Sequence, residues 1–94
     1  NEYAFFVPNS FTPNTDGKNE EFKPVVIGAK EYLLTIHDRW GSTIFTSNDP
    51  KIGWEGMNSK KQEMAPIGVY IYQARVMDYL DEFHFYSGEV NLFR

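Results

Sequence analysis

Residues 7–22 read V-P-N-S-F-T-P-N-T-D-G-K-N-E-E-F and hold the chain's densest group of residues that interrupt regular backbone structure. Pro8 and Pro13 fix φ near about −65° and carry no amide donor. Asp16-Gly17 favours a turn, because glycine accepts positive φ and an aspartate side chain can bond its own backbone. The apolar residues that flank these breakers are Phe5, Val7, Phe11 and Phe22. We therefore expect an ordered loop pinned by aromatic side chains, without regular secondary structure between residues 8 and 20.

Outside this loop the sequence has the alternation that is typical of strands. Leu34 and Ile36 occupy alternate positions, which assigns both to the core. Gly41 supplies the positive-φ residue of a short hairpin. The predicted strands, each bounded by turn signals, are 3–7, 22–27, 32–39, 43–46, 67–79 and 83–94. About six or seven short antiparallel strands without a helix predict an all-β fold, an immunoglobulin-like β-sandwich.

The longest predicted strand opens with Gly68-Val69-Tyr70, which resembles the tyrosine corner of immunoglobulin-like sandwiches. The inward-facing positions are then Tyr70, Tyr72, Ala74 and Val76. In the closing strand, Gly88 predicts a bulge or a twist point. Residues 47–66 predict a long irregular region, and we expect Trp54 to anchor it against the sheet.

Length and composition limit the classes of function. The 94 residues suffice for one domain, and a 17% aromatic content favours a core of strands. The net charge is −4 and only Lys60-Lys61 are adjacent cations, which argues against a nucleic-acid partner and a polybasic membrane anchor. The absence of cysteine excludes a disulfide scaffold and a thiolate metal site. No apolar run could span a bilayer, and no signal peptide opens the chain. We expect residues 1–94 to be one domain excised from a longer secreted protein.

Four segments together resemble the gliding-motility-associated C-terminal domain, the type B sorting domain of the type IX secretion system. Residues 8–20 are similar to the family's opening P-N-x-F-T-P-N-x-D-G-x-N-D and depart from it only at Glu20. Residues 36–45 are similar to I-x-N-R-W-G-x-x-V-F. Residues 54–56 are similar to W-D-G and count as one motif with Gly68-Val69-Tyr70. Residues 88–94 are similar to the terminal G-x-V-x-L-x-R. The order of these segments matches the family over nearly the whole chain.

The resemblance implies a C-terminal sorting signal that directs an upstream cargo protein across the outer membrane. It implies recognition by type IX outer-membrane components, including a porin-like, gliding-associated partner. The expected location is the periplasm in transit, then the cell surface or the extracellular space. We predict surface recognition by the 8–20 loop and the last strand, where an edge could add to a partner's sheet. Deletion of Val90–Arg94 is then expected to abolish export.

The residues expected to contact the partner come from the loop, the central hairpin and the C-terminus. They are Asn9, Phe11, Asn14, Asp16, Arg39, Trp40, Val90, Leu92 and Arg94. The residues expected to be structural anchors are Pro8, Pro13, Gly17, Gly41, Trp54, Gly68, Tyr70 and Gly88. Arg39 and Trp40 allow two interpretations. They could plug one end of the sandwich, or they could form a recognition corner, because arginine and tryptophan are favoured at binding hot spots.

Calcium is the one cofactor that the residues suggest, with candidate ligands Asn14, Asp16, Asn19 and Glu20. In an EF-type alignment, Lys23 falls where a bidentate acid is required. We therefore expect turn chemistry in this loop and no cofactor, with a looser calcium site as the alternative.

The sequence carries no recognisable catalytic or zinc motif, and we expect no enzyme. His37 and His84 are interpreted as solvated strand residues. The alternative function is a carbohydrate-binding or adhesin-type module of a cell-surface protein, which would need tyrosines and tryptophans in one outward-facing plane. The aromatic residues that cannot all be interior are Tyr3, Phe5, Tyr79, Phe83, Phe85 and Phe93.

Overall fold

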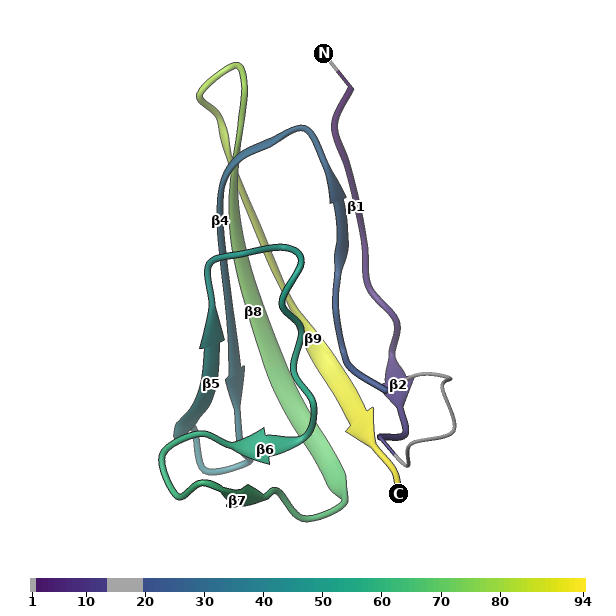
Figure 1. Ribbon diagram of the computed structural model, residues 1–94. Coiled ribbons are helices and arrows are strands. Elements are labelled where there is room, and N and C mark those ends of the chain that lie inside the picture. The colour runs from purple at the N-terminus through teal and green to yellow at the C-terminus, as the bar shows by residue number, and fades with distance from the viewer. Residues whose placement is uncertain (1, 14–19) are drawn as a thin grey trace.

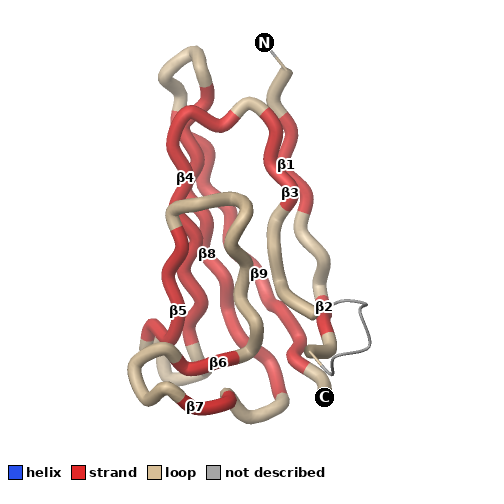
Figure 2. The backbone as a smooth tube through the Cα atoms, viewed as in Figure 1, coloured by secondary structure: helices blue, strands red, loops and turns tan. Residues whose placement is uncertain are grey.

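The strands form where the sequence alternates, and Figure 1 shows their arrangement in the computed structural model, which describes residues 2–13 and 20–94. The described part contains strands and loops but no helix (Figure 2), so nothing in it could cross a membrane as a helix. The strands are β1 (Ala4–Phe6), β2 (Ser10–Phe11), β3 (Val25–Ile27), β4 (Ala29–His37), β5 (Thr43–Ser47), β6 (Met57–Asn58), β7 (Glu63–Met64), β8 (Gly68–Asp78) and β9 (Phe83–Leu92). The predicted all-β class is confirmed.

The strands build two layers. A five-stranded sheet has the order β2-β9-β8-β4-β5, and β1-β3 and β6-β7 form two-stranded sheets. The small sheets and the loop after β5 lie over one face of the large sheet (Figures 1 and 2). Aromatic contacts such as Phe22 to Tyr72, with ring centroids 5.5 Å apart, join the layers. The fold is therefore a sandwich, with one face of the large sheet left open.

Inward alternation in the long strands makes the core. In β8, Tyr70, Tyr72, Ala74 and Val76 are buried as predicted. Leu34 and Ile36 in β4 are fully buried, and so are Val90 and Leu92 in β9. Burial of each such side chain contributes roughly 1.5–3 kcal/mol.

The prediction of no regular structure in residues 8–20 is wrong at Ser10–Phe11. This segment, β2, pairs in parallel with Asn91 and Leu92 of β9. The Asn91 and Phe93 amides donate to the carbonyls of Asn9 and Phe11 at 2.9 and 3.0 Å. Not all strands are therefore antiparallel. Pro8 follows the end of β1 by two residues, and the chain then passes from the small sheet to the edge of the large one. A segment of two residues is too short to show the period-two alternation that predicts a strand, so its pairing with β9 could not be predicted from the sequence.

Two further strand predictions need correction. The predicted 22–27 strand is shorter, because buried Pro24 cannot donate to a ladder; only Val25–Ile27 forms β3. Phe22 instead makes an isolated bridge with Trp54, with reciprocal backbone bonds of 2.7 and 2.9 Å. Residues 47–66 are also not wholly irregular, since they contain the β6-β7 hairpin.

Trp54 is the buried anchor that was predicted. Its side chain is fully buried, and its indole N–H donates to the Met57 carbonyl at 2.8 Å. Its ring lies 5.2 Å from Phe11 and 5.0 Å from Tyr70, between centroids. One indole therefore joins β2, β8 and the loop before β6.

Gly88 does not form the predicted bulge. It pairs directly with Tyr72 in an uninterrupted β8-β9 register. A Cβ at Gly88 would lie 2.8 Å from Cε2 of the Tyr72 ring. The position needs glycine because an aromatic ring occupies the space of a side chain.

Gly88→Ala is expected to lower the free energy of unfolding by about 1–3 kcal/mol, because an added methyl group overpacks the core. Urea unfolding of the purified domain measures this loss. The neighbouring Ser87→Ala, on an exposed position, is the control and should stay within about 0.5 kcal/mol of the parent. Equal stability of both variants would show that Tyr72 moves aside without cost.

Candidate recognition surface

The β4-β5 turn holds two large side chains in solvent. The Asp38 carboxylate accepts hydrogen bonds from the amides of Trp40 and Ser42 at 3.0 and 2.9 Å. Gly41 has φ +87°, which confirms the predicted positive-φ position. Trp40 is 76% exposed, and the Arg39 guanidinium lies 4.4 Å from the centre of its ring. A tight turn thus presents a stacked cation and indole.

A pocket of about 270 Å³ opens beside this pair. It lies between the β4-β5 turn, the β6-β7 hairpin and the start of β8. Exposed Met64 and Ile67 line it together with Arg39 and Trp40. We call these four residues the Arg-Trp corner.

The tyrosine corner supports the floor of this pocket. The Tyr70 hydroxyl donates to the Pro66 carbonyl at 2.5 Å, as the sequence predicted. Burial raises the pKa of Tyr70, which keeps the hydroxyl protonated as a donor. The predicted anchor Gly68 has φ +148° at the start of the same strand. The segment that carries Ile67 is therefore held in place by its own strand.

Charges at the pocket are mixed. Arg39 and Lys61 contribute cations, and Asp38 and Glu63 contribute carboxylates. Within residues 2–13 and 20–94, neither cation takes part in an ion pair. The Asp38 carboxylate is bonded to the amides of its own turn, so Arg39, Lys61 and Glu63 are the charged groups of the pocket that remain for a partner.

The C-terminal residues serve the fold. The Arg94 guanidinium donates to the carbonyls of Gly56 and Ala65 at 2.9 and 2.8 Å. The side chains of Phe11, Val90 and Leu92 are buried and offer no surface to a partner in the folded domain. Arg94 therefore fastens the chain end to the β6-β7 side of the sandwich.

The other predicted residues have mixed locations. Asn9 is exposed, and its backbone carbonyl is bonded to Asn91. Pro13 lies near Gly56, and Pro8 is exposed at the crossing between the layers.

Asn14, Asp16, Gly17 and Asn19 lie outside the described residues, so the contact, anchor and calcium predictions for them stay predictions. Among the residues described, no group of three or more His, Cys, Asp or Glu could hold a metal ion. The contact residues predicted from the sequence did not include Lys61, Met64 and Ile67, which line the pocket. In the sequence, nothing distinguishes these residues except that Lys61 is charged and Met64 apolar in a region expected to be irregular, and that Ile67 is an apolar residue at the start of a predicted strand.

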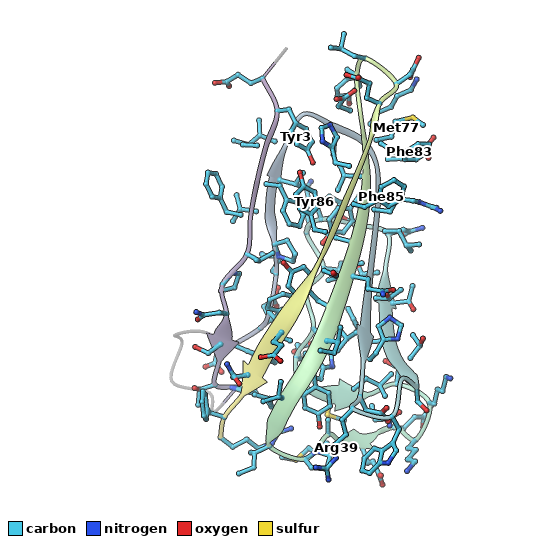
Figure 3. All side chains as sticks on the ribbon, turned by 180° about the vertical axis from the view of Figure 1, so that it is seen from behind. Tyr3, Arg39, Met77, Phe83, Phe85 and Tyr86 are labelled. Atoms are coloured by element: carbon cyan, nitrogen blue, oxygen red, sulfur yellow. The ribbon has the colours of Figure 1, made fainter. Side chains whose placement is uncertain are left out.

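At the opposite end of the sandwich, the polar aromatic side chains contact one another. Tyr3 stacks on His84 at 4.1 Å between ring centroids, and its hydroxyl is 2.8 Å from that of Tyr86. Figure 3 shows Tyr3 and Tyr86 side by side at this end, and Arg39 at the other. His84 Nε2 lies 2.8 Å from Asp78 Oδ2. The prediction of a merely solvated strand histidine is therefore wrong for His84.

His37 departs from its prediction in the same way. Its ring nitrogens lie 2.9 and 3.1 Å from the hydroxyls of Thr35 and Thr43. These contacts hold the ring on the sheet instead of leaving it free in solvent.

Asp78 is expected to make the fold sensitive to acid. Its hydrogen bond with His84, and those from the amides of Glu82 and Leu80, hold the pKa of Asp78 below its usual value. A carboxyl group with a lowered pKa stabilises the fold above its unfolded-state pKa, about 3.9. That contribution is lost as the pH falls through the lower, folded-state value.

Thermal unfolding between about pH 6 and pH 2 should thus show a smaller drop in Tm for Asp78→Asn than for the parent chain. Asp49→Asn, in an exposed turn, is the control and should follow the parent. Parallel curves for Asp78→Asn and the parent would contradict the assignment.

Aromatic side chains also lie on the open face of the large sheet. Phe83 and Phe85 stack at 6.0 Å, and Phe85 is 73% exposed. Figure 3 shows both pointing away from Tyr86. The exposed tyrosine and tryptophan side chains of the described residues are Trp40 and Tyr79, which lie on turns at opposite ends. They do not form the coplanar row that a carbohydrate platform would need.

The segments that resemble the sorting domain meet in space. Phe11 of the opening segment contacts Trp54, and Trp54 contacts Tyr70. Arg94 of the closing segment binds the Gly56 carbonyl. A sequence model of the CHU_C type IX secretion signal domain matches residues 5–88.

The chain belongs to the type IX secretion signal domain family.

The resemblance stated from the sequence is thereby confirmed. A type IX secretion signal domain acts as a C-terminal sorting signal, attached to a cargo and exported toward the cell surface or the extracellular space through the secretion system. The family is not an enzyme family.

Curated proteins give no match to the chain. Among solved structures, the chain is similar to the crystal structure of CopC from Methylosinus trichosporium OB3b. The identity is 16%, the TM-score is 0.54, and the match covers 95% of this chain and 93% of that chain. At this identity the likeness shows a shared sandwich fold for the type IX signal domain and CopC.

Proposed function

We propose that this type IX signal domain is recognised in its folded state by translocon components, and that the Arg-Trp corner is the surface they read. The proposal rests on one observation. Of the other described residues predicted to contact a partner, Phe11, Val90 and Leu92 are buried, Arg94 is bonded to backbone carbonyls, and Asn9 is exposed with its carbonyl bonded to Asn91. Arg39 and Trp40 come from the family-like R-W-G segment and project into solvent. No described core contact explains the pair.

The corner is placed for access. Figure 1 shows that the N-terminal end of the chain and the C-terminus lie at opposite ends of the sandwich. A cargo that precedes residue 1 would leave the molecule at the end that carries Tyr3. The Arg-Trp corner lies at the other end and would stay uncovered.

The chemistry of the corner suits a protein partner. Arginine and tryptophan are enriched at interface hot spots, where burial of a large side chain is combined with hydrogen bonding. We propose an outer-membrane partner of the porin-like, gliding-associated class, met from the periplasm. In this proposal the domain has no catalytic role and needs no cofactor.

Export of a fusion tests the proposal. Residues 1–94 are fused to the C-terminus of a periplasm-directed fluorescent protein and expressed in a bacterium with a type IX system and in a translocon-deficient strain. Translocon-dependent fluorescence outside the cell is the expected result. Retention of a folded fusion in both strains would overturn the proposed function.

Arg39→Ala/Trp40→Ala is expected to reduce export at least about tenfold, because two hot-spot side chains are lost. Tyr79→Ala is the matched control. Tyr79 is 61% exposed on the β8-β9 turn, where Asp78 accepts amide bonds from Leu80 and Glu82 as Asp38 does in its own turn. Melting temperatures of both purified variants should match the parent within a few degrees. Equal export of the two variants would show that recognition lies elsewhere.

A further inference from the structure

We propose that the outer edge of β9, between Phe83 and Glu89, accepts an extended strand from a translocon component. This inference rests on the proposed function and names a second contact with the same partner system. It narrows the sequence-based expectation of strand addition at the last strand to the part of that strand that β2 does not cover.

The backbone direction of β9 follows from its two neighbours. The amides of Asn91 and Phe93 point toward β2, where they bond to carbonyl oxygens. In an antiparallel pair, successive residues alternate between bonding to the partner and pointing away from it. Even-numbered residues of β9 therefore bond to β8, and the amides and carbonyls of Phe85, Ser87 and Glu89 point away from it.

β2 covers only the end of this edge. It pairs with Asn91 and Leu92, and the described residues make no other strand pairing with the outer side of β9. Pro8 lies just before β2, where the chain crosses between the layers. The open stretch of β9 therefore ends, on its C-terminal side, where β2 begins to pair. The short parallel pair shows that this edge can accept another strand, and leaves the stretch from Phe83 to Glu89 unpaired.

The open stretch lacks the usual protection of an edge. Proteins shield edge strands with prolines, lysines, bulges or very short strands. β9 spans residues 83–92, reads F-H-F-Y-S-G-E-V-N-L, and contains no proline or lysine. Its pairing with β8 has no register shift. A long, regular, unshielded edge is suited to strand addition.

The side chains along this edge define the partner strand. Phe85 is 73% exposed and stacks on Phe83, next to the Arg75 guanidinium. Glu89 is exposed on the same face. Directly opposed side chains in a sheet interact, so the strand should place an aliphatic or aromatic residue opposite Phe85 and a lysine or arginine opposite Glu89.

Blocking the edge without disturbing β8 tests the proposal. In Ser87→Pro the ring replaces an amide that points away from β8, so the β8-β9 ladder keeps its bonds. Ser87→Ala keeps the amide and is the matched control. Phe85→Lys/Ser87→Lys is a second blocking variant, which shields the edge with charges and adds no backbone restraint. Folding is verified by thermal unfolding, and export is measured with the fluorescent fusion.

The expected result is a drop of about tenfold or more in export for a folded blocking variant, from the loss of backbone hydrogen bonds, with Ser87→Ala unchanged. If the folded blocking variants are exported like Ser87→Ala, the edge inference is overturned and the proposed function stands. If the parent fusion stays in the periplasm, the proposed function falls and this inference with it. If sedimentation shows a dimer of the parent that Ser87→Pro dissociates, the occupant is a second copy, and the translocon strand is overturned.

Discussion

Trp54→Ala is expected to lower the free energy of unfolding by about 3–5 kcal/mol, the range for removing a large aromatic side chain from a core. The indole is fully buried and touches Phe11 and Tyr70. Its N–H satisfies the Met57 carbonyl, which would lose this partner. The large effect follows because one side chain joins β2, β8 and the loop that bridges to Phe22.

Urea unfolding, followed by circular dichroism, measures this loss. The matched control is Trp40→Ala, since Trp40 is the other tryptophan and is 76% exposed. Its contact with Arg39 is worth about 0.5–1 kcal/mol at an exposed site, so the expected loss is at most of that size. Similar losses for the two variants would contradict the assignment of Trp54 to the core and Trp40 to the surface.

Removing Asn91–Arg94 is expected to abolish the cooperative fold. Leu92 is fully buried, and large-to-small changes at such sites cost about 2–5 kcal/mol. The deletion also removes the amides that hold β2 and the Arg94 bonds to Gly56 and Ala65. Together these losses approach the total stability of a small domain, about 5–15 kcal/mol.

Limited proteolysis and thermal unfolding of the truncated chain measure the result. The control Phe93→Ala keeps the chain length and changes a side chain that is 54% exposed, so it should unfold within a few degrees of the parent. A cooperative transition in the truncated chain would contradict the prediction. The consequence for function is direct. Loss of export after deletion of Val90–Arg94 would report unfolding, so the edge and corner variants are the informative tests of recognition.

Local patterns predicted much of the fold. The period-two alternation in Tyr32 to Ile36 and in Tyr70 to Val76 identified the inward faces of β4 and β8. Gly41 predicted a turn with positive φ because glycine tolerates that conformation. The isolated Trp54 in a polar region predicted a buried anchor. Each of these inferences depends on chemistry within a few residues.

Other features depend on partners far along the chain. Ser10–Phe11 becomes a strand only because β9 offers unpaired backbone groups 81 residues later in the sequence, at Asn91 and Leu92. Gly88 is needed because the Tyr72 ring lies over it, whereas the sequence predicted a bulge or a twist point there. Residues of the family-like segments were predicted to contact a partner, yet most of those that the structure describes stabilise the sandwich instead.

By itself, the sequence determined the all-β class, the inward faces of the long strands, the tyrosine corner and the secretion family. These follow from side-chain alternation, turn chemistry and motif order, which are properties of short segments. Only the tertiary structure decided which family-like residues are buried, that Met64 and Ile67 join Arg39 and Trp40, and which part of β9 is an open edge. Burial and edge exposure are decided by which strand lies beside another, and that depends on contacts between residues far apart in the chain.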